Sequence, residues 1–175
     1  MRLAPGIVWA GAVAALLAAL PAHAQPRPPG GSAQGWPAVE IGARAGFDNQ
    51  QRQEVLGALL RIPVLRNGHV ELLPNADVTF LRGLKEYQLN LEAAYLLAGR
   101  EGGPYLGGGV GFRNTIPPND PTAERQTLTT FGLVVGIKFG GLGRVRPFLE
   151  FRRVFASDLA VDPQLLSFGV TFALW

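Results

Sequence analysis

From Trp36 onward the chain alternates apolar and polar positions with a period of two. Successive side chains of a β-strand point to opposite faces, so this alternation predicts strands with one apolar and one polar face. The pattern recurs in eight stretches, at residues 39–48, 56–64, 70–80, 87–97, 105–113, 130–139, 146–152 and 166–174. Because these stretches leave no segment for a helix, the sequence predicts an all-β fold of eight antiparallel strands joined in chain order.

The connections between the stretches alternate in length. Those after the second, fourth and sixth stretches are short, and the Asn67-Gly68 pair in the first of them favours a type I′ hairpin. The remaining connections are polar, and two of the four are clearly longer. With an even number of strands, both ends of the sheet are expected on the side of the short turns.

The two predicted faces differ sharply in composition. The apolar face carries no charge in any of the eight stretches, and its aromatic residues lie near the strand ends, as in the girdles of membrane barrels. The charged residues of the opposite face are Glu40, Arg44, Arg61, Glu71, Asp77, Glu92, Arg113, Lys138, Arg146, Glu150 and Arg152. That face also holds Gly107, Gly109, Gly111, Gly132 and Gly136. A crowded barrel interior needs such small residues, whereas an open surface does not. We therefore predict an eight-stranded antiparallel up-and-down transmembrane β-barrel with its apolar face toward lipid.

Residues 1–24 have the pattern of a secretory signal peptide. Arg2 precedes an apolar run at 7–20, and the triplet Ala22-His23-Ala24 marks the cleavage site. Residues 25–35 are rich in Pro, Gly and polar residues and are predicted to form a flexible leader, which leaves 36–175 for the barrel. The chain is expected to be exported to the bacterial outer membrane.

Composition narrows the function further. Sixteen Lys and Arg against thirteen Asp and Glu give a net charge of +3, and the cations do not cluster, so a nucleic-acid partner is not expected. There are no cysteines. Without disulfides, an exported chain of this size depends on a good core or on a closed hydrogen-bonded sheet.

Three stretches carry a resemblance to a known family: "PYLGGGVGF" at 104–112, "RPFLEFRR" at 146–153 and the closing "GVTFALW". With them, the region after the signal peptide resembles the small eight-stranded outer-membrane barrels of the OmpX-like and opacity-like group. The resemblance implies insertion by the outer-membrane assembly machinery, which reads the last strand. The residues expected to carry this assembly signal are Phe168, Val170, Phe172, Leu174 and Trp175. Here Leu174 holds the apolar phase, and Trp175 follows one residue later.

The sequence predicts no catalytic, cofactor or metal site. Lipid-modifying barrels, which have this architecture, need a His beside a Ser or a carboxylate near the outer rim. The one histidine after the signal peptide, His69, lies in a short turn, and we interpret it as a solvated turn residue. Ser157 and Ser167 belong to the opposite end, a strand length of roughly 30 Å away, so no Ser-His pair is expected. The stretch 119–124 lacks the spacing and glycine of a calcium loop.

The inward charges are expected to form a structural plug of ion pairs rather than a catalytic carboxylate pair. The candidates for this plug are Glu40, Arg44, Arg61, Glu92, Glu150 and Arg152. We therefore predict a monomeric, non-enzymatic outer-membrane barrel with a structural or surface-interaction role. Its expected partners are outer-membrane lipids, the assembly machinery and an unidentified partner at the outer loops. The alternatives are a small outer-membrane channel or a soluble periplasmic lipocalin-like barrel with the apolar face inside, and a lipid enzyme ranks last.

Overall fold

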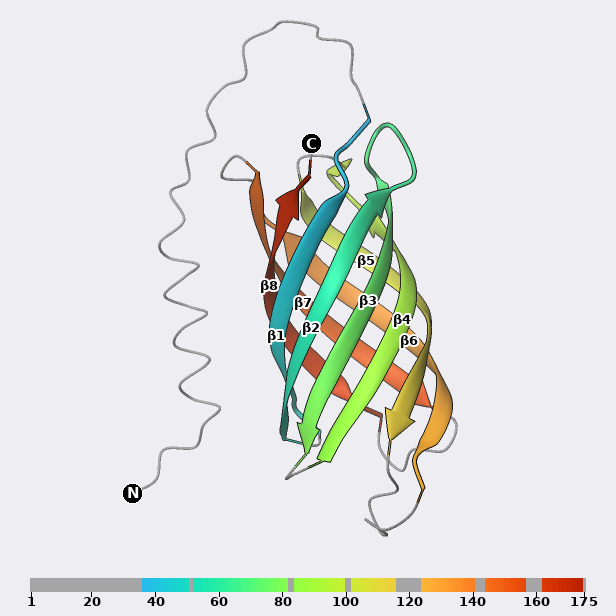
Figure 1. Cartoon of the computed structure of the whole chain (residues 1–175). Helices are drawn as coiled ribbons and strands as arrows, with labels where there is room; N and C mark the ends of the chain where they lie inside the picture. Colours follow the sequence, from blue (N-terminus) through green and yellow to red (C-terminus); the bar gives the residue numbers. More distant parts are fainter. Residues whose placement is uncertain are drawn as a thin grey trace, which may run out of the picture. The chain divides into compact units, whose positions relative to one another are not determined.

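The computed structural model describes residues 36–50, 52–81, 84–99, 102–115, 124–140, 144–156 and 162–174. They form one closed barrel of eight antiparallel strands in chain order, which confirms the predicted fold class (Figure 1). The strands are β1 (Glu40–Asp48), β2 (Gln53–Pro63), β3 (Val70–Leu81), β4 (Leu84–Leu96), β5 (Gly103–Thr115), β6 (Gln126–Lys138), β7 (Val145–Ala156) and β8 (Gln164–Ala173). Each strand overlaps one predicted stretch. Among the described residues, no helix has the length and apolar character needed to span a membrane.

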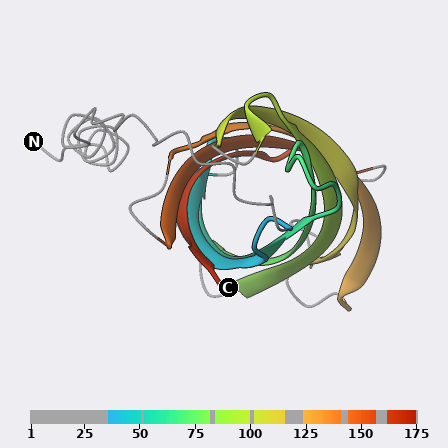
Figure 2. The ribbon, with the colours of Figure 1, turned by 90° about the horizontal axis from the view of Figure 1, so that it is seen from above.

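The barrel closes where its last strand pairs with its first. β8 runs antiparallel to β1, in a register from Glu40 opposite Ala173 to Asp48 opposite Leu165. Viewed from above, the strands form a complete ring (Figure 2). We call the end where β1 begins and β8 ends the terminal rim, and the opposite end the distal rim. Because every strand has two paired neighbours, no open sheet edge remains along the wall.

Several strands extend past their predicted ends at the distal rim. β6 begins at Gln126, and its first residues pair with the end of β5, where Thr127 lies opposite Asn114. The outward positions here are polar, so the apolar alternation stops while backbone pairing continues. Alternation marks the part of a strand with one apolar face and not its full length.

The turn between β2 and β3 differs from the predicted type I′ hairpin. The amide of Gly68 donates to the carbonyl oxygen of Leu65 over 2.9 Å, so the turn spans residues 65–68. Gly68 has a φ of 71°, whereas Asn67 does not adopt a positive φ. The side-chain oxygen of Asn67 instead accepts a hydrogen bond of 3.0 Å from the amide of His69. The prediction was wrong because this loop is longer than two residues, so that only glycine needs the left-handed conformation.

The alternation sorts side chains between the two sides of the wall. The large apolar side chains exposed along the strands' outer face include Ile41, Leu56, Phe80, Leu89, Leu91, Leu106, Val110, Phe112, Phe131, Val135, Phe151, Leu166 and Phe172. Inside, one apolar cluster consists of Leu73, Ala94, Leu96, Tyr105 and Val134, and a second of Val55, Val154 and Leu165. This arrangement excludes the lipocalin-like alternative, which required the apolar face inside.

Several predictions fall outside the described residues. These are the signal peptide at 1–24, the leader at 25–35, Ser157, most of the stretch 119–124, and Trp175.

Candidate functional site

The six residues predicted for the interior plug all lie inside the barrel and are at most 5% exposed. They come from β1, β2, β4 and β7: Glu40, Arg44, Arg61, Glu92, Glu150 and Arg152. The structure brings them into one hydrogen-bonded network, together with further polar side chains. This network is the densest concentration of chemistry-bearing groups in the described part of the chain.

Arg44 forms the centre of the network. Its Nε and Nη2 donate to the two carboxylate oxygens of Asp77 on β3 at 3.0 and 2.7 Å. Its Nη1 donates to Oε1 of Glu150 on β7 at 3.0 Å. The two-pronged contact with Asp77 matches the planar fork of a guanidinium, which fixes direction as well as charge.

Arg152 enters the same cluster from β7. Its Nη2 donates to Oε2 of Glu92 at 2.8 Å and to Oε1 of Glu150 at 2.9 Å, while its Nη1 lies 3.2 Å from Oδ2 of Asp77. Asn75 fills the remaining space, because its amide nitrogen donates to Glu92 at 3.0 Å. The cluster therefore gives each buried carboxylate a cation and gives Glu92 a neutral donor as well.

Tyr105 joins the central cluster to the terminal rim. Its hydroxyl donates to Oε2 of Glu150 at 2.8 Å and accepts from Nη2 of Arg61 at 3.0 Å. The Arg61 guanidinium also lies 4.7 Å from the centre of the Tyr105 ring and 5.0 Å from that of Phe148. A cation held over two rings is further stabilised by their negative faces.

At the terminal rim the network continues through two glutamates. Nη1 of Arg61 donates to Glu71 at 2.9 Å, and Nζ of Lys138 lies 2.8 Å from Glu71 and 3.0 Å from Glu40. Glu40 also pairs with Arg146 at 3.2 Å and accepts a hydrogen bond of 2.6 Å from the Thr171 hydroxyl. A continuous chain of contacts thus runs from the middle of the interior to this rim.

The charges of the network balance among the described residues. Its cations are Arg44, Arg61, Lys138, Arg146 and Arg152, and its carboxylates are Glu40, Glu71, Asp77, Glu92 and Glu150. A separate pair, Arg113 with Glu86, lies nearer the distal rim. Burying an unpaired ion costs several kcal/mol, and equal numbers of buried cations and carboxylates avoid this cost.

Four charged members of the network were not among the predicted plug residues: Glu71, Asp77, Lys138 and Arg146. All four lie on the face predicted to be charged, so the alternation placed them on the correct side. Asn75 and Tyr105, two uncharged residues in the same phase, were also not predicted. In the part of the chain that the structure describes, no group of three or more metal-ligating side chains has the geometry to hold a metal ion.

Inward glycines make room for the network. A Cβ atom on Gly57 would lie 2.0 Å from Oδ1 of Asp77, and one on Gly136 would lie 2.5 Å from the Tyr105 ring. At Gly132 the nearest atom would be a Glu92 oxygen at 3.3 Å. The interior near Gly57 and Gly136 is therefore filled to contact, as the position of glycines on the charged face indicated.

His69 lies in the turn between β2 and β3 but is not simply solvated. It is half-buried, and its Nδ1 donates to the carbonyl oxygen of Leu96 over 2.6 Å. Its ring stacks on Tyr95 with 5.6 Å between centroids. A solvated turn residue was the wrong interpretation, because the neighbouring strand end supplies both an acceptor and a ring. Ser167, whose hydroxyl contacts the backbone oxygen of Glu150, forms no pair with His69.

The residues predicted to carry the assembly signal lie on the outer face of β8 as far as they are described. Phe168 and Val170 are partly exposed, and Phe172 is exposed. Leu174 follows the strand, and its amide donates to the carbonyl oxygen of Val39 at 2.9 Å. Trp175 lies outside the described residues, so its part in the assembly signal remains a prediction.

No protein-family model and no curated protein matches the chain. Solved structures do match. The N-terminal β-barrel domain of OprF from Pseudomonas aeruginosa is 20% identical, with a TM-score of 0.63 over 79% of this chain and 98% of that one. Neisserial surface protein A is 15% identical, with a TM-score of 0.52 over 78% and 94%. The outer membrane enzyme PagL is 14% identical, with a TM-score of 0.52 over 77% and 99%. At these identities the likeness concerns architecture alone. The chain therefore has the fold of the small eight-stranded outer-membrane barrels.

Proposed function

We propose that the chain is a non-enzymatic barrel of the bacterial outer membrane, with a structural or surface-interaction role and a charge-paired interior that serves as its core. The observation that carries this proposal is that the usual distribution of side chains in a soluble protein is reversed. Charged side chains such as Arg61 and Glu150 are completely buried, while large apolar side chains such as Leu89 and Phe112 are 60% exposed.

An outer face with so many exposed apolar side chains is expected to contact lipid rather than water. Soluble monomers rarely expose contiguous apolar patches beyond a few hundred Å². The strands have 9 to 13 residues, and a tilted strand needs about 9 to 11 to cross the hydrocarbon core. Closure of the sheet pairs the backbone N–H and C=O groups of every strand. Such pairing is required in hydrocarbon, where no water can bind these groups. The short turns at the terminal rim then face the periplasm, and the distal rim faces outward.

The interior favours a plug over a channel. Eight strands enclose a space just wide enough for side chains, and here Arg152 and Arg44 cross it. Apolar residues such as Leu73 and Leu96, both at most 1% exposed, complete the filling toward the terminal rim. Passage of a hydrated solute would require the ion pairs to separate.

The described residues also support a non-enzymatic role. His69 is held by Leu96 and Tyr95 at the terminal rim, whereas lipid chemistry on outer-leaflet substrates requires a base at the distal rim. The carboxylates of the interior network each have a basic partner, which suits a structural network better than general acid-base catalysis.

Two measurements test this proposal. The full chain, expressed in a Gram-negative host, is expected in the outer-membrane fraction, with gel migration that changes on boiling. Extraction into buffer without detergent, with migration insensitive to heat, would overturn the membrane assignment. Reconstituted into a planar bilayer, the barrel is expected to show no steady conductance, and a stable open level would overturn the plugged interior.

A further inference from the structure

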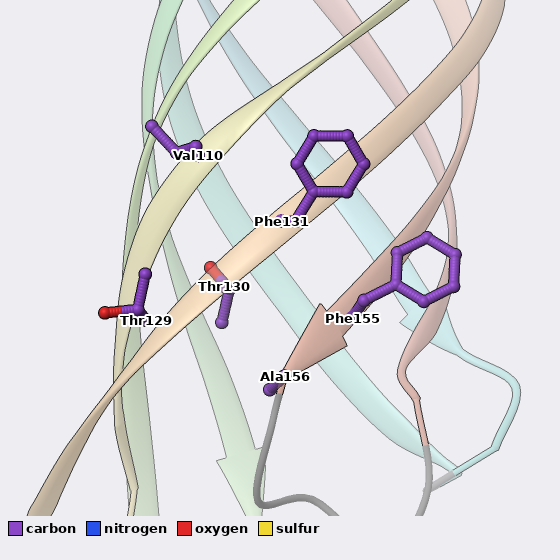
Figure 3. A pocket seen from close by; sticks show the side chains of 6 residues that line it. All are labelled: Val110, Thr129, Thr130, Phe131, Phe155 and Ala156. Atoms are coloured by element: carbon purple, nitrogen blue, oxygen red, sulfur yellow. The ribbon is translucent and has the colours of Figure 1, made fainter.

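The outward surface of β5, β6 and β7 is hollowed near the distal rim. A groove of about 440 Å³ lies there, lined by Val110, Thr129, Thr130, Phe131, Phe155 and Ala156 (Figure 3). The rings of Phe131 and Phe155 stand on neighbouring strands with 6.3 Å between their centroids. The lining is mainly apolar, and it opens on the face that the proposed function turns toward lipid.

A fixed cation lies on the same face, closer to the distal rim. Nη1 of Arg125 donates to Oδ1 of Asn114 at 2.8 Å, and its Nη2 donates to the backbone oxygen of Lys85 at 3.0 Å. The guanidinium also lies 5.5 Å from the centre of the Tyr87 ring. Contacts to β4 and β5 hold this side chain in place. Among the described residues, no carboxylate pairs with Arg125.

Lys85, whose backbone oxygen accepts from Arg125, carries a second positive charge. It shares the outward phase of β4 with Tyr87, and its side chain is exposed. A guanidinium with free donor positions and a nearby ammonium form a combination suited to phosphate oxygens.

The strand register connects the cationic cluster to the groove. Asn114 pairs with Thr127, the next outward rung pairs Phe112 with Thr129, and the one after it pairs Val110 with Phe131. From the first rung to the third is four residues, or about 13 Å along the strand. A ligand that fits this surface has an anionic head and a long apolar tail.

We propose that this surface binds an acyl lipid whose phosphate-bearing headgroup has a net negative charge. The phosphate oxygens bind Arg125 and Lys85, and one acyl chain passes over Phe112 into the groove between Phe131 and Phe155. This inference rests on the proposed function, because only a barrel within a membrane presents this face to lipid.

The opposite side of the groove offers a matched control. The Arg153 guanidinium lies 4.9 Å from the centre of the Phe155 ring, so it too is a cation held over an aromatic ring. Unlike Arg125, it pairs with a carboxylate, that of Asp162, at 3.3 Å. Its charge is therefore compensated, and it is not expected to select an anionic headgroup.

Quenching of a tryptophan in the groove tests the site. The chain from residue 25 onward carries Phe155→Trp as reporter, with Trp36→Phe and Trp175→Phe to remove background. It is refolded into phosphatidylcholine vesicles containing a minor fraction of brominated phosphatidylglycerol, or the same fraction of brominated phosphatidylcholine. The anionic lipid is expected to be enriched at the reporter by about fivefold for each cation. Arg125→Gln and Lys85→Gln should each remove about one such factor, whereas Arg125→Lys and Arg153→Gln should retain the enrichment.

A second reporter, Phe47→Trp, separates a site from general attraction of anionic lipid. Phe47 lies outward on β1 opposite Glu54, away from the cationic cluster. Equal quenching by the two lipids at position 155, equal enrichment at positions 47 and 155, or an equal loss with Arg153→Gln would each overturn the lipid site. Heat-dependent gel migration of every sample shows that the barrel is inserted. Failure of the unsubstituted chain to insert would overturn the proposed function and this site with it.

Discussion

Arg152 on β7 and Asp77 on β3 belong to opposite walls of the ring, four strands apart, yet Nη1 of Arg152 lies 3.2 Å from Oδ2 of Asp77. Both side chains are about 97% buried. This contact spans the interior from one wall to the other. The interior is therefore a core in the ordinary sense, but one built from ion pairs where a soluble protein uses aliphatic side chains.

Glu150 is expected to be the most sensitive carboxylate of this core. It accepts from Arg44, Arg152 and Tyr105 at 2.8 to 3.0 Å. Glu150→Gln keeps the shape but leaves two buried arginines short of a charge, which should lower the free energy of unfolding by about 3 to 5 kcal/mol. Urea titration of the refolded barrel in vesicles measures the loss. Glu54→Gln, on the exposed face of β2, should change it by less than about 0.5 kcal/mol. Equal effects would mean that the interior network contributes little.

Two inward glycines on β6 should respond differently to the same added methyl group. In Gly136→Ala the new Cβ meets the Tyr105 ring at 2.5 Å and the backbone oxygen of Leu149 at 2.6 Å, neither of which can move easily. A loss of about 1 to 3 kcal/mol is expected from overpacking. In Gly132→Ala the nearest atom is the end of the Glu92 side chain at 3.3 Å, so the loss should be much smaller. Midpoints of urea unfolding compare the two, and the reverse order would contradict the packing described here.

Depth in the membrane should decide the effect of a new charge on the outer face. Leu91 lies in the middle of β4 and is 54% exposed. Leu91→Arg should cost about 2 to 4 kcal/mol, because an arginine at mid-depth meets hydrocarbon. Thr127→Arg, on the same face near the distal rim, should cost about 0 to 1 kcal/mol. Refolding equilibria in vesicles give both values. A protein surrounded by water would tolerate both substitutions equally.

Deletion of Trp175 separates assembly in cells from the stability of the closed barrel. The pairs between β1 and β8 end at Ala173, and the last described hydrogen bond involves Leu174. Spontaneous refolding into vesicles is therefore expected to survive the deletion. Insertion in cells, measured as the amount in the outer-membrane fraction, is expected to fall, because the terminal aromatic belongs to the predicted assembly signal. Unchanged insertion would assign that signal to Leu174 and the residues before it.

The strands could be predicted because the outer face of each strand is apolar over most of its length. Where that apolar face ends, the sequence signal ends too. Thr127 and Asn114 pair in a regular ladder beyond the apolar band, but their side chains are polar on the outward face, so alternation did not reveal them. The turn at Asn67 was mispredicted for a related reason. Dipeptide preferences describe a two-residue loop, and only the structure reveals how many residues the loop contains.

The sequence predicted which charged residues face the interior, but not which of them are in contact. Alternation placed Arg44, Asp77 and Arg152 on the same face. Which of them meet depends on how far each strand is shifted relative to its neighbours around the ring. That stagger has no local signature, so the sequence did not identify Asp77 as the partner of two arginines. Tyr105 was missed because an inward tyrosine has the same phase as a glycine or a leucine.

Every strand contributes to the interior network, and this affects how the chain folds. The ten charged groups lie on six strands, and the hydroxyls of Tyr105 on β5 and Thr171 on β8 bring in the other two. A sheet that lacks one of the six charged strands leaves ions without their counterions, and one that lacks β5 or β8 leaves Glu150 or Glu40 without a hydroxyl donor. Such intermediates are penalised whichever strand is missing, so the last pairing step should make folding all-or-none, with closure of the ring and neutralisation of its interior as a single event.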